Sequence, residues 1–250
     1  MSNSDKWIII TGASSGIGKA TAEKLLDEGY KVVLTSRNKD KLEKVFNRFN
    51  SNILIVPFDL SKIEKLDEYV EKIIKTTGPI SGFVHCAGIR TTIPLNFIKL
   101  DNILSLFTIN TFSAIRLISL LSKSKNYNHD GASFVLISSI AAHEGAKGVA
   151  LYASTKGALE GFLTPAASEL IAKNIRINIV VPGIIETEMI QDFFKNLTDP
   201  QIEAFKKSYP LGIGKPEYIA NFIHYLVSDK AKWITGQKFI LDGGHLIRGN

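Results

Sequence analysis

Seven short apolar runs, separated by segments with helical spacing, constrain the fold of this chain more than any other feature. Most runs are rich in β-branched residues and apolar at consecutive positions, which is typical of strands that are covered on both faces. The segments between them place apolar residues three and four apart, the period of an amphipathic helix. The runs are KWIIIT (6–11), KVVLT (31–35), NILIVPF (52–58), GFVHCA (82–87), ASFVLIS (132–138), IRINIVV (175–181) and KFILD (238–242).

Strands and helices alternate along the chain without a break in composition. This order predicts one doubly wound α/β domain over residues 1–250, with a seven-stranded parallel sheet flanked by helices on both faces. Glycine ends two predicted helices, at 19–29 and 65–78, where a left-handed cap is expected. Ser61–Glu64 matches a capping box that would open the second of these helices. The interval 184–209 has no clear strand and would form a lid over a ligand at the carboxyl edge of the sheet.

The composition is that of an ordinary globular protein. Of its 250 residues, 45% are hydrophobic and 22% are charged, which is enough for one large core. No uncharged apolar run approaches the 18 or so residues that span a bilayer, and the N-terminal residues do not resemble a secretory signal. We therefore expect a cytoplasmic protein with no membrane partner. The single cysteine, Cys86, excludes an internal disulfide and a cysteine-based metal cluster, so we predict no metal site and a packing role for Cys86.

The net charge of +6 bears on the choice of partner. The lysines are scattered along amphipathic segments rather than gathered in a block, so nucleic-acid binding is not predicted. We interpret most of them as solvated helix faces. The charge favours an anionic small molecule or an acidic carrier protein as partner.

A glycine-rich loop follows the first predicted strand directly. TGASSGIG (11–18) orders its glycines as G-x-x-x-G-x-G, which differs from the G-x-G-x-x-G fingerprint but meets the same physical needs. Gly12 permits a tight turn, while Gly16 and Gly18 let the next helix approach the sheet and present its N-terminus to a pyrophosphate. The alternative is a glycine-rich turn that binds no ligand. Additional hydroxyl donors are Ser14 and Ser15.

The end of the second predicted strand bears on which dinucleotide binds. An acidic residue there would accept hydrogen bonds from the ribose hydroxyls and repel a phosphate, but the sequence has Thr35, Ser36 and Arg37. Arg37 would bind a 2′-phosphate through charge-assisted hydrogen bonds. We therefore expect NADP(H) rather than NAD(H). The alternative is that Arg37 is a surface residue at a strand end.

Further motifs follow the glycine loop in a fixed order, and together they resemble the short-chain dehydrogenase/reductase family over nearly the whole chain. Each motif alone is weak, but their joint order and spacing are specific. The C-terminal segment, PLGIGKPEYIANFIHYLVSD followed by ITGQKFILDGG, resembles the branch that contains 3-oxoacyl-acyl-carrier-protein reductases. The motifs are TGASSGIG (11–18), Asp59 in FDL, HCAG (85–88), Asn110 in FTIN, Ser139 in ISS, Tyr152 and Lys156 in YASTK, and Pro182–Gly183.

The resemblance implies a Rossmann-like enzyme that reduces a ketone to an alcohol by hydride transfer. Tyr152 and Lys156 share one face of a helix, and a nearby ammonium favours the phenolate, so we expect the pKa of Tyr152 to lie below its usual value. Tyr152 would then be the acid, and Lys156 would also hold the nicotinamide ribose. Ser139 would bind the substrate oxygen, and Asn110 would support a water relay to Lys156. The alternatives are that Ser139 only satisfies a strand end and that Asn110 only bonds a neighbouring main chain.

The resemblance also implies which residues bind the dinucleotide. Asp59 would contact the adenine, with a role in ending its strand or capping the next helix as the alternative. The predicted set is Gly12, Ser14, Ser15, Gly16, Ile17, Gly18, Arg37, Asp59, Leu60, Cys86, Ala87, Gly88, Tyr152, Lys156, Pro182, Gly183, Ile185 and Thr187.

Three positions depart from the family pattern. Cys86 stands where the family usually has asparagine, so that contact is lost or replaced. Ser15 stands where many NADPH-dependent members have a basic residue, which leaves Arg37 to carry most of the cofactor preference. Pro165 falls in the helix of the catalytic pair, where we expect a kink or a lost hydrogen bond.

The substrate is expected to contact the loops 89–94, 141–147 and 183–209. An apolar lid beside a few cations suits an acyl chain on acyl carrier protein or CoA, and it suits other carbonyl compounds nearly as well. The alternatives are a reductase of a sugar, polyol or other small ketone, and a protein that binds NADPH without turnover. The expected substrate residues are Arg90, His143, Lys147, Ile184, Ile185, Met189, Phe193 and Phe194, and the candidate carrier-docking charges are Lys123, Lys125 and Lys173.

The resemblance further implies a homotetramer or homodimer. In such an assembly the helices at about 100–123 and 151–173 would pack between subunits. The apolar run 117–121 is compatible with a buried subunit face.

Overall fold

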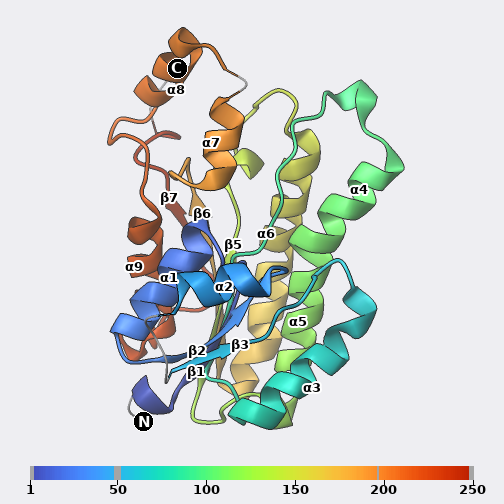
Figure 1. Cartoon of the computed structure of the whole chain (residues 1–250), viewed down its shortest axis with the longest axis vertical. Coiled ribbons are helices and arrows are strands. Elements are labelled where there is room, and N and C mark those ends of the chain that lie inside the picture. Colours follow the sequence, from blue (N-terminus) through green and yellow to red (C-terminus); the bar gives the residue numbers. More distant parts are fainter. Residues whose placement is uncertain (1–2, 48–51, 196, 248–250) are drawn as a thin grey trace.

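The computed structural model describes residues 3–47, 52–195 and 197–247. Seven parallel strands form its central sheet in the order β3-β2-β1-β4-β5-β6-β7 (Figure 1). Each predicted apolar run contains one strand, so the doubly wound prediction is confirmed. The strand order reverses between β1 and β4, the type of position at which such sheets bind ligands. The strands are β1 (Trp7–Thr11), β2 (Lys31–Thr35), β3 (Ile53–Ile55), β4 (Gly82–His85), β5 (Ala132–Ile137), β6 (Ile175–Pro182) and β7 (Lys238–Leu241).

Helices cover both faces of the sheet, and two further helices lie beyond the carboxyl ends of its strands (Figure 1). One face carries α1 (Gly16–Asp27), α2 (Lys39–Val45) and α9 (Pro216–Val227). The other carries α3 (Leu66–Thr77), α5 (Ser113–Leu121) and α6 (Ala150–Leu170). A π-helical turn, Thr108–Phe112, joins α4 (Leu100–Phe107) to α5, while α7 (Glu188–Phe194) and α8 (Asp199–Lys207) lie beyond the carboxyl ends of the strands. Short 3-10 helices are Asn3–Asp5, Ile63–Lys65, Leu95–Phe97, Ser124–Asn126, Ile140–Ala142, Ile171–Lys173 and Asp229–Ala231.

The sheet divides the core into two apolar layers. Ile8 and Ile10 of β1 pack in the layer of α1 and α9, whereas Ile9 packs in the layer of α3, α5 and α6. Successive strand residues point to opposite faces, so a strand covered on both sides must be apolar at every position. This explains the continuous apolar runs in the sequence.

The predicted helix ends are confirmed, but the predicted capping box is wrong. Gly29 and Gly78 have positive φ angles of 85° and 70°, although a ψ of −166° places Gly78 outside the left-handed helical region. Ser61 does not cap a helix, because α3 begins only at Leu66, after a 3-10 turn. The main-chain N–H of Ser61 instead donates to Asp59 Oδ1 at 3.0 Å. A local turn made by the preceding aspartate therefore replaces the box.

The helix that carries Tyr152 and Lys156 continues through Pro165. α6 runs unbroken from Ala150 to Leu170, with Pro165 inside it. Because proline has no N–H, one hydrogen bond of that turn is missing, but the helix does not end there.

One helical segment of the described chain, Leu100–Leu121, is long and apolar enough by length and composition to cross a membrane. It comprises α4, the π-turn and α5, and Leu117 and Leu121 in its second half are fully buried in the core. The core helix of a globular protein passes the same test. The expectation that the run 117–121 forms a subunit face is therefore wrong for most of its residues, because they pack against the chain's own sheet.

Candidate active site

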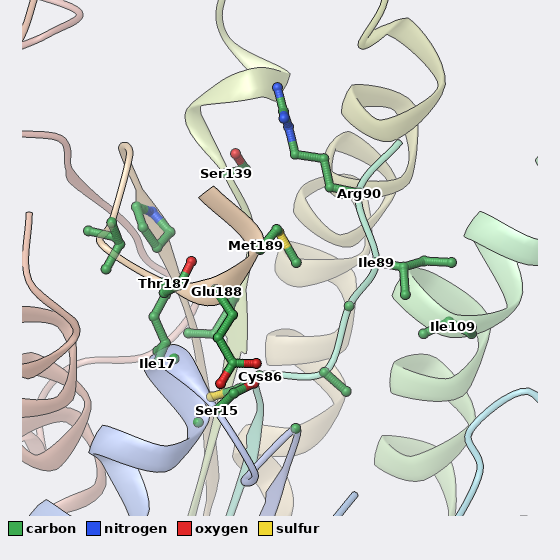
Figure 2. A pocket seen from close by; sticks show the side chains of 18 of the residues that line it. Ser15, Ile17, Cys86, Ile89, Arg90, Ile109, Ser139, Thr187, Glu188 and Met189 are labelled. Carbon is green, nitrogen blue, oxygen red and sulfur yellow. The ribbon is translucent and has the colours of Figure 1, made fainter. Parts of the chain in front are cut away.

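A cavity of about 470 Å³ opens at the carboxyl ends of the strands and runs beneath α7. Figure 2 shows Ser15 and Ile17 of the glycine loop on one wall and Thr187, Glu188 and Met189 above it. Every residue of the predicted cofactor set lines this cavity, together with Ser139. The structure therefore brings together residues that are up to 175 positions apart, from Gly12 to Thr187.

The glycine loop is shaped by close backbone approaches. Gly12 has a φ of 68°, and a Cβ there would lie 2.8 Å from the main-chain nitrogen of Ala87. A Cβ on Gly18 would collide with the carbonyl oxygen of Gly12. α1 then begins at Gly16, and the side chain of its N-cap residue, Ser15, caps no amide. The helix thus presents first-turn N–H groups to the cavity, an arrangement that fits a pyrophosphate.

The far end of the cavity is cationic. Arg37 is exposed, lines the cavity, and forms no hydrogen bond or ion pair with any residue that the structure describes. β2 ends at Thr35, and Ser36 follows it, so the end of this strand carries no carboxylate. This donor set fits a phosphorylated ribose.

Asp59 lies beside this cationic end. The Ser61 main-chain N–H that it accepts lowers the pKa of the Asp59 carboxyl, and the Arg37 charge adds a smaller effect in the same direction. This contact closes a local turn and does not cap the next helix, whose N-cap residue is Lys62, and β3 already ends at Ile55. The adenine contact stays a prediction.

Ser139 and Tyr152 meet at the other end of the cavity. Ser139 follows β5 and caps the 3-10 helix Ile140–Ala142, where its hydroxyl oxygen accepts from the N–H of Ala141 at 3.2 Å. Tyr152 lies in the first turn of α6 and is 8% exposed. The Ser139 side chain lies near enough to the Tyr152 hydroxyl to lower its pKa, and both residues line the same cavity.

Lys156 lies one turn after Tyr152 on the same face of α6, as predicted. Its Nζ donates to the carbonyl of Ile137 at 2.8 Å and lies 5.9 Å from the centroid of the Tyr152 ring. The residue is 4% exposed, and this burial lowers the pKa of Lys156 to about 8.

The expected lowering of the Tyr152 pKa is wrong for this structure. Burial raises the pKa of Tyr152 above its usual value, and the nearby Ser139 side chain and the charge of Arg90 only partly oppose the rise. Desolvation of a phenolate outweighs these contacts because the surrounding walls are apolar. At neutral pH the Tyr152 hydroxyl therefore holds its proton.

Asn110 does not line the cavity but supports it from behind. It sits in the π-turn, fully buried, with Oδ1 accepting from the N–H of Ile89 at 2.8 Å and Nδ2 donating to the carbonyl of Ile89 at 2.9 Å. Nδ2 also donates to Thr155 Oγ1 at 3.1 Å. The main-chain contacts of the alternative are present, and together with the Thr155 contact they tie the segment after β4 to α6. The water relay stays a prediction.

Cys86 is partly buried and lines the cavity rather than the core alone. Burial raises the pKa of its thiol to about 12, so the thiol is unreactive at neutral pH. The contact that the usual asparagine would make is therefore not provided by Cys86, which packs among apolar neighbours.

Several residues of the cavity were not predicted as site residues. Lys41 in α2 and Glu188 in α7 both line it, and their charged groups meet at 2.8 Å across its opening. Glu144 also lines it and hydrogen-bonds to His245 at 3.1 Å. Lys41 follows Arg37 by four residues. This closeness to a predicted site residue is the signal in the sequence that could have indicated Lys41.

Other predicted substrate and docking residues lie elsewhere. Arg90, Ile184, Ile185 and Met189 line the cavity, but His143, Lys147, Phe193 and Phe194 do not. His143 bonds instead to the buried carboxylate of Glu160, with Nε2 at 3.0 Å from Oε1. The docking candidates follow the C-terminal ends of α5 and α6, at the edge of the sheet opposite the cavity (Figure 1). These docking candidates are Lys123, Lys125 and Lys173.

Comparison with curated proteins finds relatives along nearly the whole chain. Residues 12–245 match the sequence model of a family described as enoyl-(acyl carrier protein) reductase. Carbonyl reductase family member 4 of Danio rerio is 32% identical over 238 residues, which cover 94% of this chain and 96% of the relative. An (S)-acetoin-forming diacetyl reductase of Staphylococcus epidermidis is 31% identical and covers 97% and 99%. The 3-oxoacyl-(acyl-carrier-protein) reductase FabG of Thermotoga maritima is 32% identical and covers 97% and 98%.

Solved structures share the same architecture. A short-chain type dehydrogenase/reductase from Mycobacterium ulcerans superposes with a TM-score of 0.89 at 29% identity, covering 98% of this chain and 90% of the other. ElxO with NADP bound superposes with a TM-score of 0.86 at 29% identity, covering 97% and 99%. This chain therefore belongs to the short-chain dehydrogenase/reductase family, whose members are oxidoreductases that bind NAD(P) and act on carbonyl and alcohol groups.

Proposed function

We propose that this chain reduces a ketone to a secondary alcohol with NADPH, and that 3-oxoacyl thioesters are the substrate class to test first. One observation carries the proposal. Ser139, Tyr152 and Lys156 surround one end of a cavity whose other end holds a glycine loop and the exposed cation of Arg37. Their order along the cavity matches what hydride transfer to a carbonyl requires, with proton and hydrogen-bond donors at one end and a dinucleotide site at the other.

Each residue has a role that its environment supports. When bound, NADPH would supply the hydride. Ser139 donates a hydrogen bond to the carbonyl oxygen, and Tyr152 holds its proton ready for that oxygen because burial raises the pKa of its hydroxyl. Lys156 stays mostly protonated at pH 7 with a pKa of about 8, which places a positive charge beside the developing alkoxide. Apolar side chains limit the entry of water: Ile89, Ile140, Val149, Ile184 and Met189.

The preference for NADPH rests on two cations at the far end of the cavity. Among the residues that the structure describes, Arg37 has no hydrogen-bond or ion-pair partner, and the Lys41 ammonium pairs with the exposed carboxylate of Glu188. ElxO, a neighbour of the same fold, was solved with NADP bound. A phosphate on the ribose would satisfy both cations, whereas an unmodified ribose would leave the Arg37 guanidinium unpaired.

Two substrate classes fit the apolar end of the cavity. The 3-oxoacyl thioesters agree with relatives named as 3-oxoacyl-(acyl-carrier-protein) reductases. The position of Lys123, Lys125 and Lys173 at the opposite edge of the sheet removes one argument for a docked carrier protein. Small diketones are therefore the second candidate, because the diacetyl reductase relative matches 97% of this chain.

Turnover with purified protein tests the proposal. NADPH consumption is followed with acetoacetyl-CoA, with acetoacetyl-N-acetylcysteamine, with diacetyl and with a ketose, and Tyr152→Phe is the control. We expect reduction of at least one dicarbonyl and a loss of about 10³-fold in the control. If NADPH binds but no carbonyl compound is reduced faster than by the control, the chain is a dinucleotide-binding protein without this activity.

A further inference from the structure

Arg90 is a cation at the substrate end of the cavity. It lies in the segment between β4 and the 3-10 helix Leu95–Phe97 and lines the same cavity as Tyr152 and Ser139. Figure 2 shows its side chain extending toward the segment that follows Ser139. Its charge acts on the Tyr152 hydroxyl and lowers the pKa of that group. The guanidinium is therefore within electrostatic range of the reacting position.

The guanidinium is held by an aromatic ring rather than by a carboxylate. Its Cζ atom lies 4.4 Å from the centroid of Phe193, a residue of α7. Phe193 in turn packs against Phe194 and Phe205, with ring centroids 5.9 and 5.8 Å away. This contact with a ring supplies no acceptor oxygen to the guanidinium, so its N–H donors stay available for one.

The carboxylates of the cavity wall have other partners. Asp59 accepts from the main chain of Ser61, and Glu188 pairs with Lys41. Glu144 hydrogen-bonds to His245.

Within the described residues, Arg90 itself forms no hydrogen bond or ion pair. A partly buried guanidinium with unfilled donors favours a ligand that brings an acceptor oxygen.

We propose that Arg90 is a specificity-determining residue that donates hydrogen bonds to a second oxygen of the substrate, beside the carbonyl held by Tyr152 and Ser139. The inference rests on the proposed function, and it selects dicarbonyl compounds over simple ketones. Both candidate substrates belong to this class, since a 3-oxoacyl thioester has its second oxygen on the thioester and diacetyl has it on the adjacent carbon. Arg90 keeps its proton throughout and forms no covalent bond.

The test compares paired substrates in Arg90→Met, which retains a stem that packs on Phe193 but removes the charge and the donors. For acetoacetyl-N-acetylcysteamine and diacetyl, we expect kcat/KM to fall about 10- to 100-fold, the usual worth of a hydrogen bond to a charged group. For butanone, which has one carbonyl, we expect a change smaller than about threefold. Arg90→Lys should recover part of the loss. The matched control is Lys147→Met, an exposed cation of the neighbouring loop that does not line the cavity, and it should change neither substrate.

Two results would overturn the proposal. An equal loss on butanone and on the dicarbonyls would make Arg90 a structural or general catalytic residue, and unchanged kinetics would leave it no role in binding.

If the wild-type protein reduces none of these ketones, ligand-observed NMR of its complex with NADP⁺ still decides the question. Acetylacetone should then bind more tightly than 2-pentanone, and Arg90→Met should abolish the difference. Equal binding of the two compounds to the wild-type complex contradicts the inference independently of turnover.

Discussion

Lys156 is held in a nearly dry environment with one main-chain carbonyl as its acceptor. Its pKa of about 8 lies well below its ordinary value, which means that the folded protein disfavours the ammonium. Below pH 8 the lysine is protonated in both the folded and the unfolded chain. The full free-energy cost of burying the ammonium then lowers the stability of the folded state. As pH rises from about 8 to 10.5, the folded state loses this proton first and the cost disappears.

Lys156→Met should therefore stabilise the ligand-free protein at pH 7. We expect a gain of about 1 to 3 kcal/mol in the free energy of unfolding, because the buried charge is removed while the apolar stem stays. The gain should shrink toward pH 10.5. Urea denaturation of both proteins at pH 7 and at pH 10 measures it, with Lys147→Met as an exposed control. A variant that is less stable than wild type at pH 7 contradicts the assigned burial cost.

The sequence predicted which residues meet at the catalytic end of the cavity, but not their protonation. Helical spacing fixes Tyr152 and Lys156 relative to each other, and a strand end fixes Ser139 nearby. The direction of the Tyr152 pKa depends on how much water its neighbours exclude. Those neighbours come from distant segments such as Ile89 and Leu106, whose packing no local pattern encodes.

In the glycine loop, Gly18 occupies a position where a side chain would collide with the backbone. Gly18 lies inside α1, where replacement of glycine by alanine ordinarily stabilises a helix by about 1 kcal/mol. Here a Cβ meets the carbonyl oxygen of Gly12, which belongs to the loop that turns back over the helix. Main-chain atoms of a tight turn cannot move aside.

Gly18→Ala should destabilise the protein by about 3 kcal/mol or prevent folding, since overpacking against backbone outweighs the gain in helix propensity. Gly161→Ala in α6 is the matched control, because no atom lies within 4 Å of the added Cβ, and it should stabilise by up to about 1 kcal/mol. Circular dichroism and urea denaturation of the three proteins decide the point. Similar stabilities for the two variants would contradict the close approach described for Gly18.

The ion pair between Lys41 and Glu188 joins α2 to α7 across the opening of the cavity. Both side chains are largely exposed, so the pair contributes less than about 1 kcal/mol to stability. We expect a larger effect on dinucleotide binding, because Glu188 places a negative charge where the anionic dinucleotide must enter. The two residues are 147 positions apart, and for this reason the pair could not be predicted from the sequence.

Glu188→Gln should tighten NADPH binding about three- to tenfold, because the change removes a repulsive charge and releases the Lys41 ammonium. The gain for NADH should be smaller, since NADH lacks the 2′-phosphate. Titration of the protein with each dinucleotide, followed by nicotinamide fluorescence, gives both dissociation constants without turnover. Glu43→Gln is the control, as Glu43 pairs with Lys39 at 3.1 Å and does not line the cavity. Weaker NADPH binding by Glu188→Gln would show that the carboxylate supports the site.

At the scale of the molecule, α4 and the turn before it carry an apolar surface that no described part of the chain covers. Leu95, Leu100 and Leu104 are 77%, 67% and 51% exposed, and Phe97 and Ile103 extend the same surface. Patches of this kind are rare on monomers and are typical of subunit contacts. From the sequence we expected the helices at about 100–123 and 151–173 to pack between subunits and regarded the run 117–121 as compatible with such a face, but the sheet covers most of that run. The error arose because apolar content alone does not distinguish a core face from a subunit face.

We therefore expect the wild-type protein to form a homodimer or homotetramer through this surface. Leu104→Asp should shift it toward the monomer, because burying a carboxylate in an apolar contact costs several kcal/mol at each symmetry-related copy. Sedimentation velocity over a range of concentrations measures the masses, and circular dichroism confirms that the variant is folded. Leu211→Asp, at an exposed leucine between α8 and α9, is the control and should leave the mass unchanged. A monomeric wild-type protein, or an assembly that Leu104→Asp does not weaken, would show that this surface faces solvent, and its exposed leucines would then need another explanation.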